Sequence, residues 1–164
     1  MDALERVTDF LRENDFAFRQ SDLPDLEEHQ IEILNADSGS HLRIIFGRYE
    51  ATLFFCDNHE HFDTGYDDEI YWLTELIEDL LLNRRCAASL IINKKDGSQQ
   101  LLATSFVSRK EVREAAYDKI FDDVLKLERF EKLIGNCEAR IILRFWDPSF
   151  NRDIILPRQN SFLS

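Results

Sequence analysis

The amino-acid sequence predicts an α+β fold, a two-layer sandwich in which three helices cover a mostly antiparallel sheet, in the order αβββαββαββ. Two observations predict it. Segments with alternating apolar and polar residues are joined by hairpin-type turns, and three segments with helical spacing of apolar residues separate them. Hairpin-linked strands form antiparallel sheets, and helices between them pack mainly on one face.

A short amphipathic helix is expected over residues 1–14. Its apolar residues have helical spacing, and Asp2 and Glu5 have the spacing of a capping pair. The segment Ser21–Asp25 predicts a loop, because Ser and Asp side chains bond to their own backbone and Pro24 forces the preceding residue into an extended conformation.

Three strands are expected after this loop. Alternating apolar residues place them at His29–Asn35, Leu42–Phe46 and Tyr49–Phe55, with a tight turn at Gly47–Arg48. The second helix is expected over Asp67–Arg85, with acidic residues at its start and arginines at its end, as the helix dipole favours. Its apolar stripe consists of Ile70, Leu73, Leu76, Ile77, Leu80 and Leu81.

The second half of the sequence predicts two further hairpins around a third helix. Strands at Ala88–Asn93 and Gln99–Val107 flank an Asp-Gly turn, and strands at Glu138–Trp146 and Asp153–Leu156 flank Asp147–Pro148. The third helix begins at a capping box of Ser108 and Glu111, runs to about Ile134 and ends at Gly135. Residues 159–164 are expected to be a frayed tail. Without a linker or a repeat, residues 1–164 are expected to form one domain.

The charge of the chain excludes some partners. The 164 residues include 20 Lys and Arg against 32 Asp and Glu, a net charge of −12. Such a surface repels nucleic-acid phosphates and anionic membranes, so neither is expected as a partner. The three cysteines, Cys56, Cys86 and Cys137, are far apart and lack CxxC spacing, which indicates reduced thiols. Together with an amino terminus that does not resemble a signal peptide, they predict a cytoplasmic protein.

The densest group of potential metal ligands lies between Cys56 and Asp63. On a strand, His59 and His61 would point to the same face as Asp57 and Asp63, and zinc accepts such ligands. The HExxH spacing of zinc enzymes is absent, and the alternative is a solvated, charged connection between the hairpin and the second helix. A metal-dependent enzyme therefore stays an alternative, with no metal site assigned.

Other catalytic signatures are absent from the sequence. There is no GxSxG motif, and the five glycines form neither GxGxxG nor GxxxxGK. The acidic residues around Cys56 would raise the pKa of its thiol rather than lower it. We therefore assign no catalytic residue, predict no cofactor and expect a protein that is not an enzyme.

The charge distribution is the most informative feature. From Tyr49 to Asn83 the chain has no Lys or Arg and ten acidic residues. An acidic surface with interspersed aromatic residues attracts a basic partner and supplies anchors for it. The alternative is an acidic helix face that only keeps the protein soluble. The residues expected to contact a partner are Asp57, Glu60, Asp63, Asp68, Tyr71, Trp72, Glu75, Glu78 and Asp79.

The acidic run from Glu50 to Asp79, and the Phe54–Asp63 segment that leads into an acidic helix, resemble the immunity proteins that neutralise bacterial toxins. This resemblance of type, which covers the middle half of the chain, implies an inhibitor that masks the active site of a basic toxin or enzyme. The element order also resembles class I type III secretion chaperones, which bind an extended effector segment as dimers. The strands from Arg140 to Leu156 depart from that layout.

Overall fold

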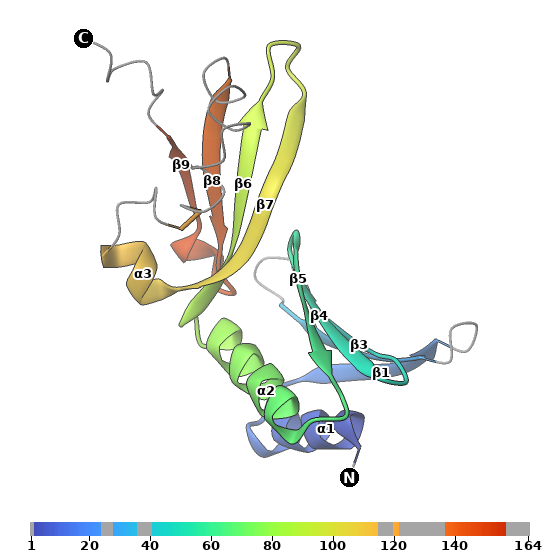
Figure 1. The fold of residues 1–164 in the computed structure, drawn as a ribbon. Helices are drawn as coiled ribbons and strands as arrows, with labels where there is room; N and C mark the ends of the chain where they lie inside the picture. Colours follow the sequence, from blue (N-terminus) through green and yellow to red (C-terminus); the bar gives the residue numbers. More distant parts are fainter. Residues whose placement is uncertain (1, 24–27, 36–40, 115–119, 122–136, 157–164) are drawn as a thin grey trace. The chain divides into compact units, whose positions relative to one another are not determined.

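The computed structural model describes residues 2–23, 28–35, 41–114, 120–121 and 137–156. They form mixed α+β structure with two antiparallel sheets, and the chain divides into two compact units, Met1–Asn83 and Arg84–Ser164 (Figure 1). The single-domain prediction stays a prediction, because two compact units can belong to one domain or to two. None of the described helices combines the length and the apolar character that a membrane span requires.

The described residues of the first unit form two helices and a five-stranded sheet in the order β1-β2-β3-β4-β5. The helices are α1 (Ala3–Glu13) and α2 (Asp67–Leu81). The strands are β1 (Phe18–Leu23), β2 (Glu28–Leu34), β3 (His41–Phe46), β4 (Glu50–Phe55) and β5 (Asn58–Asp63). Each strand pairs antiparallel with the next one along the chain.

Two of these strands were not predicted, so the predicted order αβββαββαββ is wrong in this unit. Ser21, Asp22 and Leu23 belong to β1 rather than to a loop, and β5 replaces the predicted charged connection. The remainder of the predicted loop lies outside the described residues. Both strands lie at the edges of the sheet and consist mostly of exposed residues. Because these strands are held by backbone pairing with one neighbour and bury few side chains, their sequences lack the alternation of apolar and polar residues that indicates a strand.

The helices of the first unit bury their apolar sides in its core. All six residues of the predicted α2 stripe are buried, together with Val7 and Leu11 of α1 and inward-facing residues of β2–β5. Asp2 caps α1 as expected, by accepting a hydrogen bond from the Glu5 N–H at 2.8 Å. Helix α2 ends at Leu81 rather than at Arg85, because Asn83 adopts a left-handed conformation with φ 57°.

In the second unit, the residues that the structure describes form a four-stranded sheet in the order β7-β6-β8-β9. Its strands are β6 (Arg85–Asn93), β7 (Gln99–Ser108), β8 (Glu138–Arg144) and β9 (Arg152–Ile155), and its described helices are α3 (Arg109–Glu114) and the 3-10 turn η2 (Pro148–Phe150). The sequence predicts one sheet, whereas the described residues form two separate sheets.

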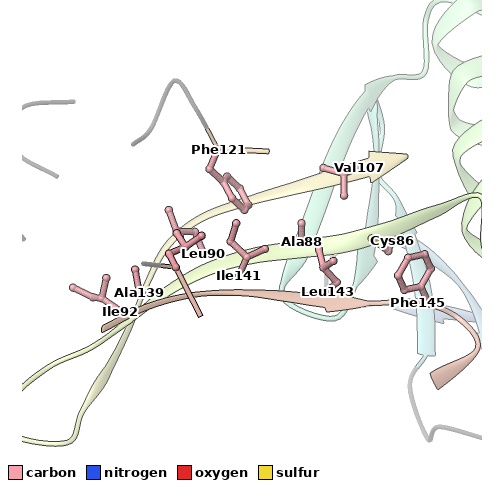
Figure 2. Packing of buried hydrophobic residues seen from close by; sticks show 11 residues of the cluster. Cys86, Ala88, Leu90, Ile92, Val107, Phe121, Ala139, Ile141, Leu143 and Phe145 are labelled. Carbon is pink, nitrogen blue, oxygen red and sulfur yellow. The ribbon is translucent and has the colours of Figure 1, made fainter. Parts of the chain in front are cut away.

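Local predictions for the second unit agree with the structure. The Asp-Gly turn joins β6 to β7 with Gly97 at φ 84°, β8 pairs with β9, and Ser108 and Glu111 form the capping box of α3. Ile120 and Phe121, which the sequence places inside the third helix, lie in a turn, so that part of the prediction is wrong. The predicted end of the helix at Ile134–Gly135 and the frayed tail lie outside the described residues. Apolar side chains of β6, β7 and β8 gather with Phe121 and Phe145 into the core of this unit (Figure 2).

Candidate functional site, an acidic and aromatic helix face

The outward side of α2 carries exposed aromatic side chains between carboxylates. Tyr71 is 57% exposed and Trp72 is 54% exposed, although the apolar stripe of the same helix is buried. Asp68 and Glu75 are also exposed. We call Asp68, Tyr71, Trp72 and Glu75 the α2 face. Large aromatic residues at the surface are typical anchors of protein interfaces, where they bury much area on binding.

The amphipathic pattern of α2 explains why these residues point outward. A wide apolar stripe fixes the rotation of the helix on the core, and residues opposite the stripe face the solvent. Asp67, Asp68 and Glu69 occupy the first turn, where negative charge is stabilised by the helix dipole. Asp67 forms an ion pair with Arg6 of α1, which connects the two helices.

Tyr71 and Glu75 interact within the α2 face. The Tyr71 hydroxyl donates a hydrogen bond to Glu75 Oε1 at 2.8 Å. This bond and the negative charge of Glu75 raise the pKa of the Tyr71 phenol above its usual value. The bond also holds the exposed ring in one orientation, which lowers the entropy lost when a partner covers it.

The structure divides the predicted partner-binding residues into three groups. Asp68, Tyr71, Trp72 and Glu75 lie together on α2, as predicted. Glu78 and Asp79 lie on the same helix but are half-buried. The other three belong to the β4–β5 hairpin, where Asp57 is in the turn, Glu60 is on β5 and Asp63 ends β5. The register places the Glu60 side chain on the face of the sheet opposite to Asp63.

Two exposed tyrosines were missed by the sequence reasoning. Tyr66 is 65% exposed and immediately precedes α2, and Tyr49 is 68% exposed in the turn between β3 and β4. The Thr64 N–H donates to the Tyr49 carbonyl at 3.0 Å, which places Tyr49 beside the segment that leads into α2. Their signal in the sequence is weak, because both lie in connections where no periodicity separates outward from inward residues.

The two histidines considered as candidate metal ligands, His59 and His61, lie on the outer face of β5. His61 Nδ1 is 2.8 Å from Glu50 Oε1, and this hydrogen bond lowers the pKa of the Glu50 carboxyl. His59 stacks on Phe54 with ring centroids 5.9 Å apart. His59, His61 and Asp63 share one face, as predicted, and Asp57 lies in the turn. Among the residues that the structure describes, no three His, Cys, Asp or Glu side chains form a group that could hold a metal ion.

The first unit also has an open cavity of about 460 Å³ between the starts of its helices and the β3–β4 turn. Within its lining, Arg6 pairs with Asp67, and on β2 His29 Nδ1 lies 2.7 Å from Asp22. These pairs leave the α2 face as the stronger candidate site.

No family model, curated protein or solved structure matches the chain. A function is therefore inferred from the geometry and charge of the site.

The negative charge of the protein belongs to its first unit. Residues 1–83 contain 5 Lys and Arg against 21 Asp and Glu, a net charge of −16. Residues 84–164 contain 15 against 11, a net charge of +4. The α2 face thus belongs to a unit whose field attracts cations at long range, while the other unit has the opposite sign.

Proposed function

We propose that this protein binds a basic protein partner through the α2 face and inhibits the partner by covering its active site, as an immunity protein inhibits a toxin. The observation that carries the proposal is the exposure of Tyr71 and Trp72 between the carboxylates of Asp68 and Glu75. Aromatic anchors supply affinity once water is excluded, and the surrounding carboxylates select a basic partner.

The charge of the first unit supports a basic partner. Attraction between a strongly acidic unit and a basic protein accelerates their encounter, and this acceleration falls with ionic strength. Active sites that bind nucleic acid or other anions are commonly basic. An acidic inhibitor competes for such a site by supplying carboxylates in place of substrate phosphates.

The test begins with capture of a partner from a lysate of the native source at low salt, followed by purification of that partner. Titration calorimetry should give a one-to-one complex whose dissociation constant rises steeply between about 50 and about 300 mM salt. The partner's own activity should fall in proportion to the fraction bound. A saturated complex that retains full activity, or an affinity independent of salt, would contradict the proposal.

A further inference from the structure

Strand β5 is an edge of the five-stranded sheet and pairs with β4 alone among the described strands. Cys56 and Asp57 form the two-residue turn of this hairpin, with Phe55 opposite Asn58. After such a turn, hydrogen-bonded and non-hydrogen-bonded pairs alternate along the strands. His59 and His61 therefore belong to non-hydrogen-bonded pairs, and their N–H and C=O groups point away from β4.

The outward edge of β5 has little backbone pairing. The Asp63 carbonyl accepts a hydrogen bond from the Tyr66 N–H at 3.3 Å. Within the described part of the chain, the outward backbone groups of His59 and His61 have no backbone partner. These two residues thus offer two donors and two acceptors, spaced as an added strand requires.

Strand β5 lacks several of the features that protect an edge strand, although Glu60, which pairs with the buried Leu53, carries a charge on its core-facing side. Natural edges are blocked by lysine, proline, a bulge or a very short length. Strand β5 has six residues, contains no lysine or proline, and keeps a continuous register with β4. In comparison, the edge strand β9 of the second unit has four residues and contains Arg152. The edge of β5 is therefore suited to pair with another strand.

The charges at this edge select the occupant. Asp57, Glu60 and Asp63 are all exposed, and β5 contains no lysine or arginine. A second copy of the chain would bring the same three carboxylates against them, and like charges on paired strands are destabilising. A segment with lysine or arginine at alternate positions carries them all on one face, and on the outer face they would pair favourably with Asp63.

We propose that β5 accepts an extended basic segment of the protein partner as an additional strand of the sheet. The identity of this segment as part of the partner rests on the proposed function. Main-chain hydrogen bonds to His59 and His61 would supply the pairing, and basic side chains on the outer face would contact Asp63, with Asp57 nearby in the turn. The partner would then be held by the α2 face and by the β5 edge.

The test uses the full chain and a synthetic peptide of about eight residues that alternates Lys with Val, long enough to cover a strand of ordinary length. At saturation, amide exchange at His59 and His61, measured by NMR, should slow by about tenfold or more, because the new bonds protect these amides. A peptide with the same sequence, N-methylated on the edge that would face β5, should give no protection. Equal binding or equal protection by both peptides would overturn strand addition.

Two variants test the edge itself. His61→Pro removes an outward N–H without removing a hydrogen bond to β4, so it should lower the affinity for the Lys-Val peptide by about tenfold. Circular dichroism should show that the fold of this variant is unchanged. Asp57→Asn with Asp63→Asn removes both charges, keeps an acceptor for the Gly65 N–H, and should weaken binding of the peptide by about fivefold or more through lost charge pairs. Unchanged affinity in the double variant would overturn the choice of a basic segment.

The edge proposal and the proposed function fail separately. Asp68→Lys with Glu75→Lys should lower the affinity for the intact partner and leave the affinity for the Lys-Val peptide unchanged, because the peptide contacts β5 and not the α2 face. If the peptide shows no saturable binding while this variant still weakens the partner, the edge proposal is wrong and the proposed function stands. If the peptide binds as described and this variant leaves the partner's affinity unchanged, the function proposed for the α2 face is wrong.

Discussion

Tyr71 donates a hydrogen bond to Glu75 across one turn of α2, with 2.8 Å between the phenol oxygen and Oε1 of the carboxylate. Residues four apart on a helix lie one above the other, so the pair is a direct consequence of the sequence spacing. The bond fixes an exposed ring in the middle of the α2 face and makes its position an ordered feature of the free protein.

The Tyr71 titration is the first prediction. The Glu75 hydrogen bond and charge raise the pKa of the Tyr71 phenol above 10.0, so Glu75→Gln should lower it toward that value. Because the raised pKa belongs to the folded state, the contribution to stability is present below about pH 10 and is lost as the pH rises through the folded pKa. NMR of ring-labelled tyrosine measures this pKa. An unchanged value in Glu75→Gln would contradict the role of this bond.

Removal of the Trp72 side chain should separate binding from stability. Because Trp72 is 54% exposed, Trp72→Ala should lower the free energy of unfolding by less than about 1 kcal/mol. If Trp72 anchors the interface, the same substitution should reduce the free energy of binding to the partner by about 2 kcal/mol, a factor of about 30 in the dissociation constant. Urea unfolding and calorimetry give the two quantities.

Leu82→Ala is the matched control for this experiment, since Leu82 is a 50% exposed apolar residue just after α2 and outside the α2 face. It should alter neither quantity by more than about 1 kcal/mol. Equal loss of affinity in both variants would show that Trp72 has no special role.

The cysteines should differ sharply in reactivity. Burial raises the pKa of the Cys86 thiol to about 12, whereas Cys56 is exposed in the β4–β5 turn. Since the thiolate is the reactive species, a thiol reagent at about pH 8 should label Cys56 in the folded protein and Cys86 after unfolding. Mass spectrometry of the labelled peptides identifies each site. Rapid labelling of Cys86 under native conditions would contradict its place in the core.

The capping box of α3 predicts a stability change in the second unit. Glu111 accepts a hydrogen bond from the Ser108 N–H at 2.8 Å, and its own N–H donates to Ser108 Oγ at 3.1 Å. Ser108→Ala should lower the free energy of unfolding by about 1 kcal/mol, because the Glu111 N–H loses its partner. Urea unfolding measures this change, and Ser108→Thr, which keeps the hydroxyl, should recover most of the loss.

The same capping box is sensitive to acid. The hydrogen bond from Ser108 lowers the pKa of the Glu111 carboxyl below 4.5. The resulting stabilisation is present above that pH and is lost as the pH falls through the folded pKa. Glu111→Gln should therefore show a smaller loss of stability on acidification than the unmodified protein. An identical pH dependence in both would contradict the assignment.

The sequence predicts elements well where a buried face imposes periodicity. All six apolar residues predicted for the stripe of α2 are buried, and β6 and β7 form the predicted hairpin around the Asp-Gly turn. The predicted end of α2 is wrong by several residues. The left-handed conformation of Asn83 ends the helix, and a single Asn is a weaker signal for this conformation than Gly.

The two edge strands of the first unit, β1 and β5, were not predicted from the sequence. Strand β5 buries Asn58 and Phe62, with three exposed residues between them, so no alternation marks it as a strand. Strand β1 has four consecutive exposed residues for the same reason. Both strands are specified by pairing with a neighbour, which is a tertiary interaction that local periodicity does not encode.

The candidate site was predictable in part for the same physical reason. Tyr71, Trp72 and Glu75 could be placed outside because the α2 stripe defines the inward direction. Glu60 and Asp63 could not be assigned to opposite faces while β5 was unrecognised. The exposed tyrosines, Tyr49 and Tyr66, lie in connections, where no periodic pattern separates outward from inward residues. The function assigned to the site stays a prediction.

The most direct test of the central claim compares the partner's affinity for two charge-reversed proteins by calorimetry. One carries Asp68→Lys with Glu75→Lys on the α2 face, and the matched control carries Glu5→Lys with Glu13→Lys on α1, where both glutamates are also exposed. Both variants change the net charge of the first unit equally, and both reverse one acidic residue in the first turn of a helix. We predict that the α2 variant weakens binding by about 2 kcal/mol or more beyond the control. Equal affinities of the two variants would contradict the claim that the α2 face binds the partner.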